Sequence, residues 1–134
     1  MAIVTNTAST TTITRDDAVE LKDAMFRDEL LTFSDAGTVK KGTILARDTA
    51  SGKLVPFVKG GAGGAESPKA ILTYDVQVDA AGDASIRAAV VGKFRKQKLI
   101  IAADGDDSNI DNAVMDSLRQ VSLIPIDVYE STII

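Results

Sequence analysis

Residues 40–58 read KKGTILARDTASGKLVPFV, with two short apolar runs on either side of a polar turn. The first run, Thr43–Arg47, is β-branched and aliphatic, and the second is Leu54–Val58. Between them, Gly52 can adopt a positive φ at no steric cost. The pattern predicts two strands joined by a tight connection. Pro56 has no N–H to donate to a ladder, so we expect the second strand to lie at an edge or to bulge there.

Other apolar runs are also short and are separated by Gly, Asp and Pro. We expect further strands at residues 30–33, 70–78, 85–94 and 124–128. Gly92, inside one of these runs, indicates a bulge or the close approach of another backbone. Short strands at this spacing predict a mainly β fold, a small β-barrel or β-sandwich.

One amphipathic helix is predicted near the C-terminus, after the acidic segment DGDDSNID that starts at Asp104. One stripe of side chains recurs there at intervals of three and four residues: Ile110, Ala113, Val114, Ser117, Leu118 and Val121. We expect Asp107 or Ser108 to cap the helix, because their side chains accept hydrogen bonds from the first turn. The stripe should cover an open end of the barrel, with a partner-binding role as the alternative. The acidic segment lacks the glycine and glutamate positions of an EF-hand.

The composition limits what the chain can do. Its 134 residues suffice for one domain, and 45% apolar residues argue against a disordered chain. A net charge of −4 argues against nucleic acid and anionic membranes as partners. The absence of cysteine and histidine excludes disulfides, Ser-His-Asp triads and sites that use these residues to hold a metal. We expect no cofactor and no enzyme activity.

Two segments with superficial resemblance to known sites do not fit them. The glycine-rich segment 59–68 lacks the Lys-Ser/Thr pair and following helix of a phosphate-binding loop, so a surface loop is expected. A hydrolase that used carboxylates would need two of them facing across a cleft, and the candidates are Asp75, Asp79 and Glu66. Their spacing favours none of them.

The N-terminal residues 1–28 are predicted to form an arm that is largely extended or flexible, before a single β-rich domain at 29–134. Threonine and β-branched residues dominate its first half and favour an extended backbone. Such an arm is either a frayed end or a strand that pairs with the edge of a partner sheet. Residues 15–26 fit a short helix or an extended run.

No apolar run approaches the ~20 residues that cross a bilayer, and no signal peptide is recognised, so we expect residence in a cytosol.

The segments GTILARDTASGKLVPF at 42–57 and AILTYDV at 70–76, in this order, resemble the head decoration proteins of tailed bacteriophages, typified by that of phage lambda. The resemblance extends from Leu30 to the C-terminus. It implies a homotrimeric cement protein on the outer surface of the expanded head in the virion, stabilising it against internal DNA pressure. The implied partner is the major capsid protein lattice, to which the N-terminal arms bind.

From this resemblance, the predicted capsid contacts are the arm residues Thr10, Thr11, Thr12 and Ile13, pairing with an edge strand of the capsid. The longer body and the late helix depart from the simplest form of the family. The alternatives from other classes are a small hydrolase that uses carboxylates and a β-barrel module that binds a ligand.

Overall fold

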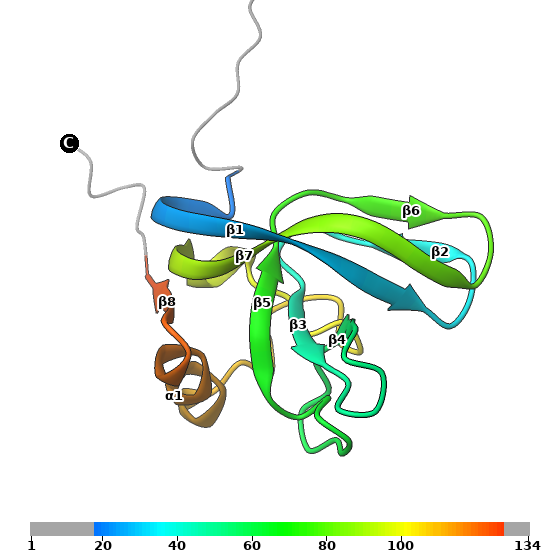
Figure 1. Ribbon diagram of the computed structural model, residues 1–134. Coiled ribbons are helices and arrows are strands. Elements are labelled where there is room, and N and C mark those ends of the chain that lie inside the picture. The colour runs from blue at the N-terminus through cyan, green and yellow to red at the C-terminus, as the bar shows by residue number, and fades with distance from the viewer. Residues whose placement is uncertain (1–17, 128–134) are drawn as a thin grey trace, which may run out of the picture.

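The computed structural model describes residues 18–127, and its fold is mainly β, as predicted, with 49% of residues in strands and 11% helical (Figure 1). The strands are β1 (Glu20–Phe33), β2 (Gly37–Val39), β3 (Ile44–Arg47), β4 (Leu54–Pro56), β5 (Pro68–Leu72), β6 (Val76–Val78), β7 (Gly82–Arg95) and β8 (Leu123–Ile126). The helical elements are the 3-10 turn η2 (Lys96–Lys98) and the α-helix α1 (Asn112–Gln120).

Five strands close into a barrel in the order β1-β4-β3-β5-β7, because β7 also pairs with β1. The antiparallel β1–β7 pair is the longest ladder, running from Glu20↔Phe94 to Phe33↔Gly82. Figure 1 shows these two strands as a long twisted ribbon above β3, β4 and β5. Strand β8 adds in parallel to the end of β7, and β2 and β6 form a separate two-stranded sheet.

The predicted pair of strands in the segment 40–58 is confirmed. Strands β3 and β4 are antiparallel neighbours joined by a tight turn. In this turn the Ser51 N–H donates to Oδ2 of Asp48 (3.1 Å), and Gly52 has a φ of +75°. The sequence therefore encodes this hairpin locally, through turn chemistry that acts over a few residues.

Pro56 does not mark an edge strand, so that prediction is wrong. Strand β4 lies between β3 and β1. The contact with β1 is a single parallel pair, Leu31↔Leu54, two residues before the proline. Because Pro56 is the last residue of β4, the strand can end in a residue that has no N–H.

Residues 70–78 were predicted to form one strand, but in the structure they contribute to two separate strands. Strand β5 ends at Leu72, and β6 begins at Val76 in the other sheet. Two of the three residues between them have distant partners: the Arg87 N–H donates to the Tyr74 hydroxyl (2.8 Å), and the Lys41 N–H donates to Oδ1 of Asp75 (2.8 Å). These contacts redirect the chain out of the barrel wall.

The first strand of the barrel is also longer than expected. The predicted strand at 30–33 is the end of the longer β1. Of the two possibilities for residues 15–26, the described part from Glu20 onward is extended rather than helical. Pairing with β7 over most of its length stabilises this conformation.

The late helix is confirmed, but its start is not where we predicted. Its N-cap is Asp111, whose Oδ1 accepts from the Val114 N–H (3.1 Å), and not Asp107 or Ser108. The preceding residues form a turn instead, in which the Ile101 N–H donates to the Asp106 carbonyl oxygen (3.1 Å). A backbone held in this turn cannot begin a helix until several residues later.

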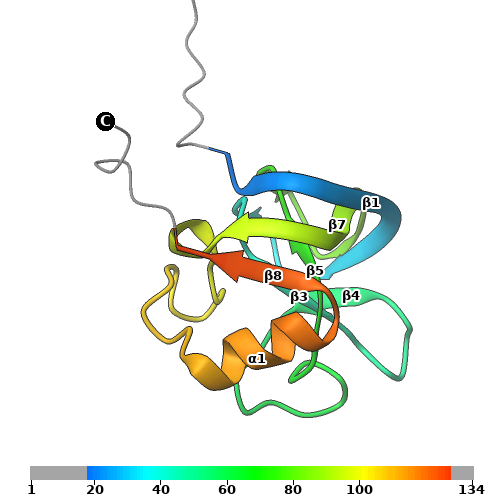
Figure 2. The same ribbon diagram turned by 90° about the vertical axis from the view of Figure 1, so that its left-hand side faces the viewer.

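The buried side of α1 packs against β8, as Figure 2 shows. Val114 and Leu118 are buried in the same cluster as Leu123 of β8, whereas Ala113 is exposed. The stripe is therefore narrower than predicted, and the protein's own core covers it. A second cluster fills the barrel and is mostly aliphatic, with members on five barrel strands: Leu31, Phe33, Leu45, Leu54, Ala70, Leu72, Ile86 and Ala88.

Gly92 allows β1 and β7 to approach closely, as its position in the predicted strand suggested. Its φ is +144°, and a Cβ on it would lie 2.7 Å from the Cα of Ala24. The β1–β7 register shifts at this point, between Lys22 and Met25. A side chain here would therefore push the two barrel strands apart.

We predict that Gly92→Ala destabilises the fold more than Gly82→Ala, by at least about 1 kcal/mol in the free energy of unfolding. Both glycines are in β7 with nearly the same φ, +144° and +146°, but a Cβ at Gly82 meets nothing within 4 Å. The control therefore carries the backbone strain without the close contact. Urea denaturation of both variants measures the difference, and equal losses would contradict the role given to Ala24.

Candidate functional site

The described chain begins and ends beside the same residue of β7. Phe94 pairs with Glu20 of β1 on one side and with Pro125 of β8 on the other. Neighbouring strands lie about 4.8 Å apart, so Glu20 and Pro125, close to the two ends of the described chain, are separated by about 10 Å. We call this end of the barrel the terminal end; Figure 2 shows β1, β7 and β8 side by side there.

The predicted capsid contacts, Thr10, Thr11, Thr12 and Ile13, lie outside the described residues. The expected arm at 1–28 overlaps the barrel, because residues 20–28 are extended within β1, most of them paired with β7. The part of the arm that precedes β1 joins the barrel at the terminal end.

The three candidate carboxylates of the hydrolase alternative are not brought together. Asp75 and Glu66 line separate hollows, of about 440 and 280 Å³. Glu66 accepts a hydrogen bond from the Gly64 N–H (3.0 Å), and Asp79 lies in the turn after β6. Within residues 18–127, no three acidic, histidine or cysteine side chains are grouped to hold a metal ion.

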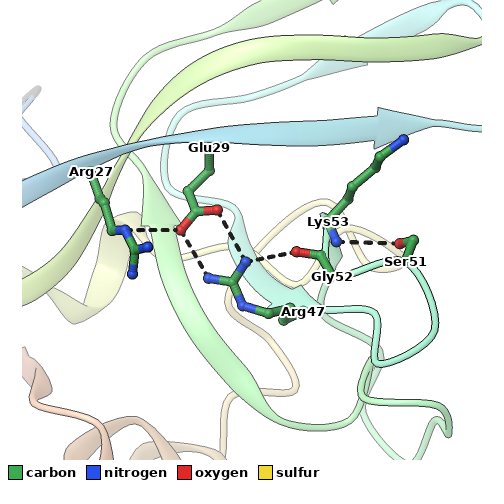
Figure 3. Close-up of polar contacts among 6 residues, drawn as sticks. All are labelled: Arg27, Glu29, Arg47, Ser51, Gly52 and Lys53. Atoms are coloured by element: carbon green, nitrogen blue, oxygen red, sulfur yellow. Dashed lines mark hydrogen bonds and ion pairs between the residues drawn. The ribbon is translucent and has the colours of Figure 1, made fainter.

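A charged cluster joins β1 to the hairpin of β3 and β4 (Figure 3). Arg47 donates two hydrogen bonds to Glu29, from Nη1 to Oε1 (3.0 Å) and from Nη2 to Oε2 (2.9 Å). Nη1 of Arg47 also donates to the Gly52 carbonyl oxygen (2.8 Å), and Nε of Arg27 lies 3.6 Å from Oε2 of Glu29. The cluster therefore fixes Glu29 from two sides.

The contacts of this cluster indicate a role in stabilising the fold. The side chain of Glu29 is only 11% exposed, and the hydrogen bonds from Arg47 lower the pKa of its carboxyl group. Glu29 in turn raises the pKa of Arg47. A carboxylate held ionised by two hydrogen bonds is a poor proton donor. Because β1 and β4 share a single ladder pair, this ion pair between β1 and the end of β3 helps to hold β1 against the β3–β4 hairpin.

The outward side of β1 carries an apolar surface that sequence reasoning missed. Met25, Phe26 and Leu30 are 63%, 39% and 43% exposed, whereas the neighbouring Leu31 is fully buried. We call Met25, Phe26 and Leu30, with Asp28 among them, the β1 flank. The available signal was the pair Leu30-Leu31, since adjacent apolar residues in a regular strand point to opposite faces. Met25 and Phe26 are both exposed at a shift in the β1–β7 register, which the sequence did not indicate.

The sequence model of the family described as bacteriophage lambda head decoration protein D matches residues 34–123, about two thirds of the chain. The chain belongs to this family. The match begins just after β1 and ends at the first residue of β8, so it spans most of the decoration protein's barrel and all of α1. No curated protein matches the chain.

Membership confirms the resemblance inferred from the sequence. The chain is a phage head decoration protein that associates with the capsid of the virion, and its family consists of structural proteins that are not known as enzymes. In the described part of this decoration protein, no helix has the length and apolar character needed to cross a membrane.

We predict that Glu29→Gln lowers the free energy of unfolding by roughly 1–3 kcal/mol at neutral pH, because Arg47 loses its charged acceptor. Glu29 has a lowered pKa in the folded state, so its contribution is present above the ordinary value of 4.5 and is lost as the pH falls through the folded value. The difference between wild type and variant should therefore shrink below about pH 4.5.

Asp28→Asn is the matched control. Asp28 is the adjacent residue of β1 and makes an exposed contact of 3.5 Å with Arg87. Exposed ion pairs contribute about 0–1 kcal/mol, so this variant should remain close to wild type. Urea denaturation at pH 7 and pH 3.5 measures both variants, and equal effects at pH 7 would argue against the Glu29–Arg47 junction.

Proposed function

We propose that this decoration protein binds the outer surface of the mature, expanded phage head as a homotrimer and stabilises the shell against internal DNA pressure. The partner is the major capsid protein lattice, and the protein is made in the host cytoplasm before it joins the virion. The observation that carries the proposal is the family match over the barrel. A net charge of −4 supports a protein partner rather than nucleic acid.

The terminal end supports a particular orientation on the shell. Both the N-terminal arm and the residues after β8 join the barrel there, about 10 Å apart across β7. If this end faces the shell, both segments can reach the capsid without passing around the barrel. We therefore place the terminal end toward the capsid.

The arm would attach by forming a strand. In this proposal the arm is the part of residues 1–28 that precedes β1, and residues 29–134 form the decoration domain together with the paired part of β1. The threonine-rich segment Thr10–Ile13 pairs with an edge strand of the capsid, where main-chain hydrogen bonds give affinity. Three arms in one trimer act together, because the second and third contacts are effectively intramolecular.

Stabilisation of the shell then follows from mass action. A protein that binds the expanded lattice and not the unexpanded one stabilises the expanded state by about 2.7 kcal/mol per site when its free concentration is 100 times Kd. No covalent chemistry is needed. The dispersed positions of Asp75, Asp79 and Glu66 support adhesion rather than hydrolysis.

We predict that deletion of residues 2–14 reduces occupancy of expanded heads at least about tenfold, because one arm contact per subunit is lost. Co-sedimentation of the protein with undecorated expanded heads measures occupancy, and circular dichroism checks that the barrel is folded. Undiminished binding would refute the arm contact.

A matched pair of substitutions separates strand pairing from mere arm length. Thr11→Pro removes an N–H and disfavours pairing, whereas Thr11→Val keeps a β-branched side chain and the N–H. Occupancy should fall for the proline variant and persist for the valine variant. Equal occupancy of the two would rule out a ladder at this position.

A further inference from the structure

Two segments that are far apart in the sequence bring basic side chains together where β7 ends. The Ile100 N–H donates to the Gly42 carbonyl oxygen (2.8 Å). Gly42 has a φ of +94°, and a side chain on it would collide with the Lys98 carbonyl oxygen, so the two backbones are in close contact. We call the basic residues beside this contact the basic rim, which consists of Lys40, Lys41, Arg95, Lys96 and Lys98.

Most of the basic rim has no ion pair within residues 18–127. Lys96 alone has one there, a contact of 3.9 Å between its Nζ and Oδ2 of Asp107. Nε of Arg95 is buried and has no hydrogen-bond acceptor in the same part of the chain. A buried donor without an acceptor is unfavourable, because it has lost its hydration. The rim therefore offers several donors to an anionic group.

A hollow of about 440 Å³, the one that contains Asp75, gives this group a place to bind. Lys40, Lys41 and Lys98 line it. The aspartates on its wall already have partners in the fold, which are the Lys41 N–H for Asp75 (2.8 Å), the Ser108 N–H for Asp106 (3.0 Å) and Lys96 for Asp107. The ammonium groups of the three lysines are thus available to a carboxylate from outside the hollow.

The N-terminal arm joins the barrel at the wall of the same hollow. Val19 lines the hollow, and its carbonyl oxygen accepts from the Arg95 N–H (2.9 Å). Two carboxylates precede it closely in the sequence, at Asp16 and Asp17. Asp17 is two residues from Val19, at most about 7 Å away even in a fully extended chain. A short tether of this kind gives a high effective concentration, on the order of millimolar, which a free ligand would have to exceed.

We propose that the basic rim is a binding site for the acidic pair Asp16–Asp17 at the base of the arm. The pair supplies two carboxylates, and the rim supplies ammonium groups and the Arg95 guanidinium, so the bonds are charge-assisted. Binding here fixes the direction in which the arm leaves the barrel and keeps residues 1–14 free. The site is complete within one chain, so the proposal holds or fails in the free protein, whether or not the protein binds a phage head.

The first test is carbodiimide cross-linking of the free protein, which joins a carboxylate to a lysine amine in contact with it. Peptide mass spectrometry should find an isopeptide bond from Asp16 or Asp17 to a lysine of the rim, in chains that remain monomers on a denaturing gel. The ion pair between Lys59 and Asp111 (2.8 Å) is the internal control for the reagent. The bond from the arm should disappear in the double variant Asp16→Asn, Asp17→Asn.

Three results of the cross-linking would overturn the proposal. The first is the control bond without any bond from the arm to the rim. The second is a bond from the rim to Glu130 or the C-terminal carboxylate, which would assign the rim to the other terminal segment. The third is a bond from the rim to the arm of another chain only.

The second test measures protection of the bond after Arg15, which adjoins the acidic pair. An arginine-specific protease should release residues 1–15 about three- to tenfold faster from the double variant Lys41→Gln, Lys98→Gln than from wild type, the size expected for partly exposed ion pairs. Lys69→Gln is the matched control, because Lys69 is an exposed lysine that lines a different hollow. It should be cleaved at the wild-type rate.

Salt distinguishes charge attraction from an altered backbone in this second test. At about 1 M sodium chloride, where the Debye length is about 3 Å, wild type should be cleaved nearly as fast as the double variant. Equal rates for all three proteins at low salt overturn the site. A difference that persists unchanged at high salt does so as well, since the substitutions would then act through the fold.

Discussion

Closure of the barrel by antiparallel pairing between β1 and β7 is the constraint on which the structure depends. Without it, the ladder pairing of β1 with the other described barrel strands would be reduced to Leu31↔Leu54. The same ladder brings Glu20 beside Phe94 and so locates the terminal end. Gly92 makes the closure sterically possible, because a larger residue would meet the backbone of β1 at Ala24.

The functional surfaces follow from this closure. Because β1 uses one edge for β7, most of its other edge has no partner among the described strands, and its outward side chains form the flank. The terminal end and the flank lie at different places along one strand.

The sequence predicted what local chemistry determines. The β3–β4 hairpin depends on a turn within six residues, and the close approach at Gly92 on a glycine inside an apolar run. The division of residues 70–78 could not be predicted, because it depends on Arg87 and Lys41, which are remote in the chain. The cap at Asp111 was missed because several acidic residues competed, and a backbone turn at Ile101–Asp106 decides among them. The flank was missed because exposure depends on which face of β1 the rest of the barrel covers.

The chain separation across the β1–β7 ladder has a consequence for biosynthesis. Phe94 follows Glu20 by 74 residues, so a ribosome finishes the first barrel strand long before its partner emerges. Long-range pairing of this kind carries a large loop-closure cost and forms slowly. The strand that bears the arm is therefore translated well before the strand that closes it into the barrel.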